Sequence, residues 1–238
     1  MIDPFALQAR LADVRARIER AAGRAGRDPA SIRLVAVSKT FPADAVRAAA
    51  VAGQIDFGEN KVQEGLQKIE ETRDLAIRWH LIGHLQSNKA KKAGRFDVIH
   101  SIDSADLLAK VDAAAAAAGR RIDLLVQVDL AGEATKHGAQ ENGLAAIFDA
   151  ACGARATEVV GLMLLPPAAD DPTAARPYFR ALREVRDRLL ARGVDSSRLR
   201  ELSMGMSHDF EVAVEEGSTM VRVGTAIFGD RQRGQTPA

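Results

Sequence analysis

The chain has 238 residues, of which 47% are hydrophobic, and its 33 basic side chains nearly balance its 32 acidic ones. This composition suits a globular protein with a sizeable core, and a net charge of +1 gives no field that would attract nucleic acid. A lone cysteine excludes an internal disulfide and a thiolate metal site, which fits a reducing compartment. No apolar run near the N-terminus resembles a signal peptide or a membrane anchor, so we expect a cytoplasmic protein without a membrane partner.

The first predicted element is an amphipathic helix over residues 3–22. Asp3 and Pro4 are typical of a helix start, and an apolar stripe follows them. The stripe consists of Leu7, Leu11, Val14 and Ile18. We expect this helix and its connector, residues 1–30, to precede the main fold.

Eight short apolar runs then alternate with helical patterns. The predicted strands cover residues 32–38, 55–58, 77–83, 97–101, 122–130, 158–164, 199–202 and 220–224. The predicted helices cover residues 42–52, 60–71, 86–93, 104–118, 140–152, 172–191 and 208–216. Eight such units predict one α/β domain over residues 1–238, a (β/α)8 TIM barrel with an extra N-terminal helix. A doubly wound open sheet is the alternative, because the run at 199–202 is a weak strand.

Lys39 is the first candidate for chemistry, because it follows an apolar strand where barrels place their functional residues. Partial desolvation at this position lowers the pKa of a lysine and leaves an amine that condenses with aldehydes. A lysine that points into solvent at the strand end is the alternative interpretation.

Small residues after the last two predicted strands suggest a phosphate site. Gly205, Ser207, Gly224 and Thr225 allow backbone amides to approach an anion, and a following helix adds the positive end of its dipole. The loops after strands seven and eight are the usual phosphate site of such barrels.

Five segments together resemble the YggS/PROSC family of proteins that bind pyridoxal 5'-phosphate (PLP). They are VAVSKT (35–40), FGENKVQE (57–64), WHLIGHLQSNK (79–89), GLMLLPP (161–167) and the long block 202–229. The resemblance implies a fold-type III barrel like the N-terminal domain of alanine racemase. It further implies a monomer that takes part in PLP homeostasis, with apo PLP-dependent enzymes as possible partners and without established turnover.

The resemblance also implies roles for individual residues. Lys39 would carry PLP as a Schiff base, and Asn60 would contact the cofactor ring. The phosphate would lie against Ser207, Gly224 and Thr225. Arg222 would face the pyridine nitrogen, where a permanent positive charge weakens the ring as an electron sink.

Four further residues lie near the predicted barrel mouth. Met204 is expected to line the pocket as a soft apolar side chain. The family's usual asparagine after the fifth strand is Asp129 here, and the residue after Ser207 is His208, so no role is assigned to either. Lys136, in the same loop as Asp129, would help PLP to leave or would simply be solvated.

Two other groups of residues resemble a metal site and an anion-binding patch, but we expect neither. His80 and His84 have a metal-like spacing, but a strand that runs into a glycine turn separates them, so no metal site is predicted. The basic cluster Lys89, Lys91, Lys92 and Arg95 is interpreted as a solvated helix face.

A small PLP-dependent amino-acid racemase is the alternative function. Such an enzyme needs a second base, a tyrosine from a partner subunit with a further domain. The single tyrosine, Tyr178, falls in the predicted helix 172–191, and few residues follow Gly224. We therefore expect a protein that binds the cofactor rather than an enzyme, and a lysine-dependent aldolase is less favoured still.

Overall fold

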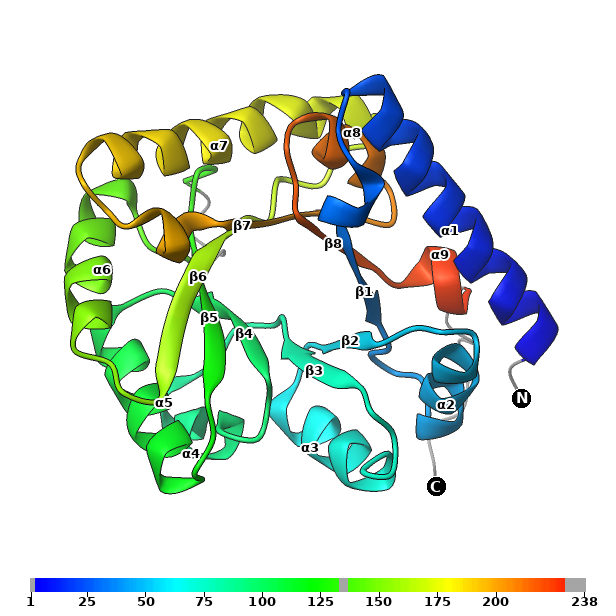
Figure 1. Cartoon of the computed structure of the whole chain (residues 1–238), viewed down its shortest axis with the longest axis horizontal. Helices are drawn as coiled ribbons and strands as arrows, with labels where there is room; N and C mark the ends of the chain where they lie inside the picture. The colour runs from blue at the N-terminus through cyan, green and yellow to red at the C-terminus, as the bar shows by residue number, and fades with distance from the viewer. Residues whose placement is uncertain (1–2, 133–136, 230–238) are drawn as a thin grey trace.

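The eight apolar runs of the sequence become eight parallel strands that close into a barrel (Figure 1). The computed structural model describes residues 3–132 and 137–229. The strands are β1 (Arg33–Val37), β2 (Asp56–Glu59), β3 (Arg78–Leu81), β4 (Val98–Ile102), β5 (Ile122–Gln127), β6 (Thr157–Met163), β7 (Glu201–Met206) and β8 (Met220–Val223). Each strand pairs with the next, and β8 pairs with β1. The barrel prediction is confirmed, and the open-sheet alternative is wrong.

Helices surround the ring of strands in Figure 1. They are α1 (Pro4–Arg24), α2 (Ala43–Val51), α3 (Val62–Glu71), α4 (Ala90–Ala93), α5 (Ala105–Ala117), α6 (Leu144–Cys152), α7 (Arg176–Ala191), α8 (Phe210–Glu215) and α9 (Thr225–Phe228). Short 3-10 turns lie at η1 (Pro29–Ser31), η2 (Ser87–Lys89), η3 (Glu141–Gly143), η4 (Pro172–Ala175) and η5 (Ser196–Leu199). The predicted basic cluster around α4 is exposed, as expected for a solvated face. None of the helices described is long and apolar enough to cross a membrane.

The seventh strand differs from its prediction. It begins at Glu201 and continues to Met206, whereas residues 196–199 form a 3-10 turn. The small residues of this segment suggested a loop, but pairing with β6 and β8 on both sides outweighs their weak strand preference. Gly205 therefore lies inside the strand, with a φ of 95°, and an added Cβ there would meet the Cβ of Ala213 at 2.6 Å. Its small size allows α8 to approach.

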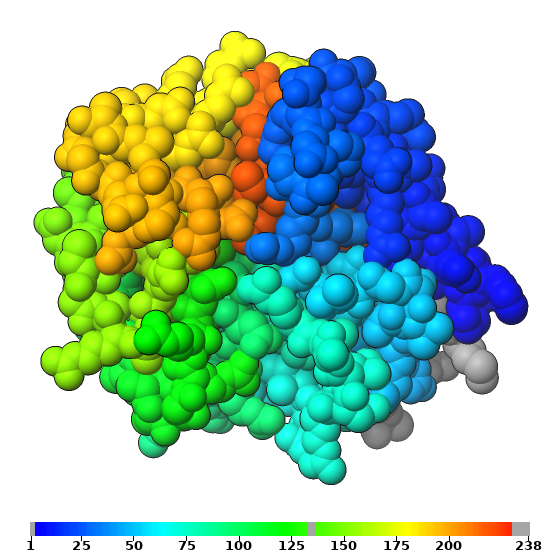
Figure 2. Space-filling view, in the orientation of Figure 1, coloured from blue at the N-terminus to red at the C-terminus, as the bar shows by residue number. Residues whose placement is uncertain are grey.

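Helix α1 closes the side of the barrel where the last two helices are short. Its first turn is capped by Asp3, whose carboxylate accepts a hydrogen bond from the Phe5 amide at 3.0 Å, and its predicted apolar stripe is buried. Arg17 pairs with Glu211 of α8, and Arg10 donates to the Ile227 carbonyl of α9 at 2.7 Å. Figure 2 shows the blue α1 segment beside the orange segment that contains α8. The N-terminal helix thus supports the elements that follow β7 and β8.

The core has two layers, and the inner one is unusual. A large apolar cluster lies between the strands and the helices, whereas the apolar cluster inside the barrel consists of Val98, Leu125, Val160 and Met163. Barrel interiors are usually filled by layers of branched apolar side chains. Here the buried polar side chains of His80, His100, Ser203 and Arg222 take part of that space.

Candidate functional site

The turn that carries Lys39 begins as soon as β1 ends. The Ser38 amide donates to the Gly58 carbonyl of β2 at 3.0 Å, and the next two residues form the turn. Thr40 has a φ of 69°, a left-handed conformation that is rare for a β-branched residue and costs about 1–3 kcal/mol. The Lys39 side chain is half-buried. Strain of this kind is typical of functional sites and indicates that the surroundings hold the turn in place.

A buried ion pair between Lys68 and Glu59 stabilises this turn. The Lys68 ammonium donates to the Ser38 carbonyl at 2.8 Å, to Glu59 at 2.6 Å and to Glu64 at 3.0 Å. Glu64 in turn accepts a hydrogen bond from the Thr40 amide at 2.6 Å. Burial raises the pKa of Glu59 even though the Lys68 charge opposes the shift. Lys68, which sequence analysis did not single out, therefore ties α3 to the turn that contains Lys39.

Strand register brings three of the predicted residues to one edge of the barrel. Val37 pairs with Gly58 of β2, and Ala36 pairs with Val223 of β8. The residues that follow these strands, Lys39, Asn60 and Gly224, therefore lie at the carboxyl edge of the barrel, where barrel enzymes have their sites. An added Cβ on Gly224 would come within 3.2 Å of the Val37 carbonyl oxygen, which shows how closely the two strand ends approach.

Two buried polar atoms near this edge have no hydrogen-bond partner. They are Asn60 Oδ1 and Glu59 Oε2. Among the residues described, no other buried side-chain nitrogen or oxygen atom lacks a hydrogen-bond partner. Buried polar atoms are nearly always hydrogen-bonded, so an exception requires an explanation such as a missing ligand. The unpaired Asn60 oxygen fits a residue that contacts a cofactor.

Three of the predicted phosphate residues, Ser207, Gly224 and Thr225, lie together where β7 and β8 end. Ser207 Oγ accepts hydrogen bonds from the backbone amides of Gly224 at 3.0 Å and Ala226 at 3.5 Å. A hydroxyl that accepts these bonds keeps its own hydrogen for donation. Thr225 is exposed at the first position of α9. The loop thus offers hydroxyl donors at an edge that a small anion can reach.

Arg222 points into the barrel from β8 and is 3% exposed. Its Nη1 donates to Ser203 Oγ at 2.5 Å, and its Nη2 donates to the Leu164 carbonyl at 2.8 Å. Burial lowers the pKa of Arg222 to about 10, although the Asp209 carboxylate opposes the shift. The guanidinium therefore remains charged near pH 7.

Met204 does not lie in the predicted loop. It is fully buried within β7, in the apolar layer between strands and helices. Strand residues alternate between two faces, and its neighbour Ser203 occupies the inward face. The prediction of a loop position for Met204 is wrong, and its buried position lends no support to a role in lining the pocket. Met206, at the end of the same strand, is 37% exposed.

Asp129 and His208, to which the sequence assigns no role, form hydrogen bonds within the protein. Asp129 accepts hydrogen bonds from the amides of Ala131 and Gly132 and from the Gln140 side chain, so it holds its own loop. His208 bonds to the Asp170 carbonyl at 2.8 Å. Lys136 lies outside the described residues.

The two histidines with metal-like spacing have separate neighbours. His80 Nδ1 contacts His100 Nε2 at 2.9 Å inside the barrel, whereas the His84 ring stacks on His137 at 3.5 Å. Within residues 3–132 and 137–229 there is no group of three or more His, Cys, Asp or Glu that would hold a metal ion.

Known proteins are similar to this chain in sequence. The chain matches the family described as alanine racemase, N-terminal domain, over residues 9–232. A pyridoxal phosphate homeostasis protein of Aquifex aeolicus is 43% identical over 224 residues, covering 94% of this chain and 97% of the relative. The protein of the same name from Escherichia coli K12 is 40% identical over 228 residues, covering 93% and 95%. The chain belongs to the family of pyridoxal phosphate homeostasis proteins.

Solved structures agree with this membership. PipY of Synechococcus elongatus, crystallised with PLP bound, has a TM-score of 0.83 and 40% identity, covering 94% of this homeostasis-family chain and 100% of PipY. An alanine racemase from Streptomyces lavendulae has a TM-score of 0.67 at 23% identity, and the present chain covers 58% of it. That second likeness shows the barrel fold alone. The resemblance seen in the sequence is confirmed at the level of the family and the fold.

The backbone of Asn60 packs closely against Gly83. An added Cβ on Gly83 would lie 2.1 Å from the Asn60 carbonyl oxygen, so one backbone must move. We expect Gly83→Ala to lower the free energy of unfolding by about 1–3 kcal/mol, the usual cost of overpacking. Urea unfolding measures the change. Gly23→Ala in α1 is the control, since nothing beyond its chain neighbours and the nearby backbone of its own helix lies within 4 Å of its added Cβ. Equal effects of both variants would contradict the contact.

The buried histidines predict a pH dependence of stability. Burial lowers the pKa of His80, although Asp56 opposes the shift, and burial together with His80 and Arg222 lowers that of His100 further. Below about pH 6.5 these histidines bind protons in the unfolded chain but stay neutral in the folded protein. The free energy of unfolding therefore decreases as the pH is lowered. The slope reaches about 1.4 kcal/mol per pH unit for each histidine.

We therefore expect His100→Gln to flatten the fall in unfolding free energy between about pH 6.5 and 5, measured by urea unfolding. The comparison uses the slope, so a lower overall stability of the variant does not matter. The control is His208→Gln, which removes an exposed histidine and leaves the buried pair intact. Identical slopes in all three proteins would show that His100 is protonated equally in both states.

Proposed function

We propose that this chain binds PLP through a Schiff base on Lys39. The observation that carries the proposal is the position of Lys39 on a strained turn at the carboxyl edge of the barrel, near the unpaired Asn60 oxygen. The PLP held by PipY supports the choice of ligand. Condensation of the lysine amine with the PLP aldehyde forms a carbon–nitrogen double bond and releases one water molecule.

The residues around this edge suit the remaining parts of the cofactor. The Asn60 side-chain amide suits a polar contact with the cofactor ring, and the Arg222 guanidinium suits the pyridine nitrogen. Ser207, Thr225 and the amide of Gly224 suit the phosphate, since hydroxyl and backbone donors form charge-assisted hydrogen bonds to phosphate oxygens. Met204 is left out of this arrangement because it lies in the outer core.

A charged arginine at the ring nitrogen favours storage over catalysis. PLP enzymes that stabilise carbanions use the ring as an electron sink, and a fixed positive donor at the nitrogen disfavours the protonation that strengthens the sink. We propose that the protein buffers or delivers PLP as a monomer in the cytoplasm, with apo PLP-dependent enzymes as recipients. A part for Lys136 in releasing PLP stays a prediction.

Racemisation is the alternative function. Tyr178 lies on α7, half-buried against the outer apolar layer, so it does not supply a second base inside the barrel. A chiral assay of alanine and other amino acids with the PLP-loaded protein tests this alternative. Turnover that persists in preparations free of contaminating racemase would favour the enzyme.

The Schiff base itself is tested by reduction. Borohydride converts it to a stable secondary amine, and mass spectrometry of the digested protein then locates the modified lysine. We expect the label on the peptide that contains Lys39. A label elsewhere with Lys39 unmodified would overturn the assignment.

A further inference from the structure

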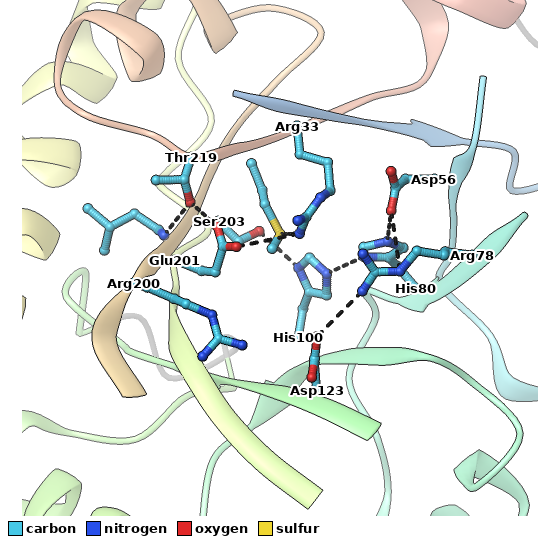
Figure 3. Close-up of polar contacts among 12 residues, drawn as sticks. Arg33, Asp56, Arg78, His80, His100, Asp123, Arg200, Glu201, Ser203 and Thr219 are labelled. Carbon is cyan, nitrogen blue, oxygen red and sulfur yellow. Dashed lines mark hydrogen bonds and ion pairs between the residues drawn. The ribbon is translucent and has the colours of Figure 1, made fainter. Parts of the chain in front are cut away.

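Five side chains form a continuous hydrogen-bonded path across the barrel interior. Arg222 Nη1 contacts Ser203 Oγ at 2.5 Å, and Ser203 Oγ contacts His100 Nδ1 at 2.9 Å. His100 Nε2 contacts His80 Nδ1 at 2.9 Å, and His80 Nε2 contacts Asp56 Oδ1 at 2.8 Å. Figure 3 shows His100 in the middle of this path, between Ser203 and His80. The path thus joins β8, β7, β4, β3 and β2.

When both histidines are neutral, the two ends of the path fix the direction of every hydrogen bond in it. A guanidinium only donates and a carboxylate only accepts. His80 therefore donates from Nε2 to Asp56 and accepts at Nδ1 from His100 Nε2. His100 then accepts at Nδ1 from the Ser203 hydroxyl, which accepts in turn from Arg222. Each donor has an acceptor when both histidines are neutral, and burial lowers the pKa of both imidazoles.

The path runs from a buried end to a partly exposed one. Ser203, His100 and His80 are 0% exposed, whereas the Asp56 side chain is 14% exposed at the first residue of β2. Arg78 lies beside Asp56 at 3.9 Å and beside Asp123 at 3.4 Å. The buried end is therefore linked to charged groups at the amino-terminal edge of the barrel, opposite the edge that carries Lys39. Asp56, Arg78 and Asp123 of this edge are labelled in Figure 3.

We infer that Ser203, His100 and His80 are positioning residues, which orient the Arg222 guanidinium for the cofactor ring and anchor it to Asp56. The contact between Arg222 and the ring rests on the proposed function, whereas the path itself does not. Two N–H groups of Arg222 are held by Ser203 and by the Leu164 carbonyl, so the plane of the guanidinium is fixed. Apolar side chains would fill this volume at lower desolvation cost, which favours a specific use of the polar path.

The direction of the path is tested without any cofactor. Long-range proton–nitrogen correlation spectra of the nitrogen-15-labelled protein distinguish the two neutral forms of each histidine. We expect the proton on Nε2 of both His80 and His100. Asp56→Ala should shift the side-chain resonances of both histidines and of Arg222. Asp123→Ala should leave Arg222 unchanged, since Asp123 pairs with Arg78 and with neither histidine. A proton on His100 Nδ1 would overturn the path as described.

The positioning role is tested by comparing two ligands. One is PLP, and the other is its 1-deaza analogue, in which carbon replaces the ring nitrogen. We expect Ser203→Ala to weaken PLP binding about tenfold, the usual loss for a hydrogen bond to a charged group, and to leave binding of the analogue nearly unchanged. Ser218→Ala is the matched control, because Ser218 is another fully buried hydroxyl with bonds only to backbone carbonyls of Leu202, Met204 and Met220.

The outcomes separate this inference from the proposed function. An equal loss for PLP and its analogue in Ser203→Ala would mean that Ser203 only supports the fold, and the positioning role would be wrong. If the wild-type protein bound neither ligand, the proposed function would fail, whereas the spectra would still decide the path. Should Ser203→Ala not fold, His80→Gln gives the same comparison from the other side of His100.

Discussion

Replacing Lys39 by alanine is expected to abolish the absorption band that PLP acquires on Schiff-base formation. Lys39 is the half-buried lysine on a turn that directly follows a barrel strand, and its neighbours Ser38 and Thr40 are held by Lys68 and Glu64. Without its amine the aldehyde of PLP at the proposed site loses its partner for condensation. Titration of PLP into the wild type and the variant, followed by absorption spectroscopy, measures the effect.

Two lysines near the same edge serve as controls for Lys39→Ala. Lys61 also follows a strand, but it is exposed at the start of α3, so Lys61→Ala should keep the full band. Lys68→Met removes the buried tie to the Ser38 carbonyl and should weaken the band together with the stability of the fold. An undiminished band in folded Lys39→Ala, checked by circular dichroism, would show that another amine binds the aldehyde.

The strands could be predicted because parallel strands covered by helices are buried on both faces. Their sequences are nearly continuous apolar runs such as the one before Lys39, and these runs alternate with helical patterns in the order of the barrel. The position of Lys39 followed from the same pattern. The small residues of the segment 203–206 predict a loop, because small residues favour turns. Nothing in the local sequence shows that strands on both sides pair with this segment.

The polar interior of the barrel could not be predicted, because its contacts span the sequence. Ser203 and His100 are 103 residues apart, and no spacing rule relates them. A signal did exist at His80, a polar residue inside the apolar run 77–83, but nothing in the sequence relates it to His100. Lys68 gave no signal, since a lysine on an amphipathic helix is normally solvated. It is buried here because Glu59 and the Ser38 carbonyl both face it.

The double replacement Ser207→Ala and Thr225→Ala is expected to weaken PLP binding far more than binding of pyridoxal, which lacks the phosphate. Ser207 already accepts hydrogen bonds from the amides of Gly224 and Ala226, so its hydroxyl hydrogen is directed away from them, and Thr225 is exposed beside it. Each lost charge-assisted hydrogen bond costs about 1.5–3 kcal/mol, which is about tenfold or more in affinity.

Equilibrium dialysis of both ligands against the double variant and the wild type measures that difference. Ser197→Ala is a suitable control, because it removes an exposed hydroxyl from the turn before β7, at the opposite edge of the barrel. Loss of PLP affinity alone would mean that the loops after β7 and β8 hold the phosphate, as their shared hydrogen bonds suggest. Equal losses for PLP and pyridoxal would instead mean that the two hydroxyls support the ends of β7 and β8, and the phosphate would then have to lie against other donors of the barrel edge.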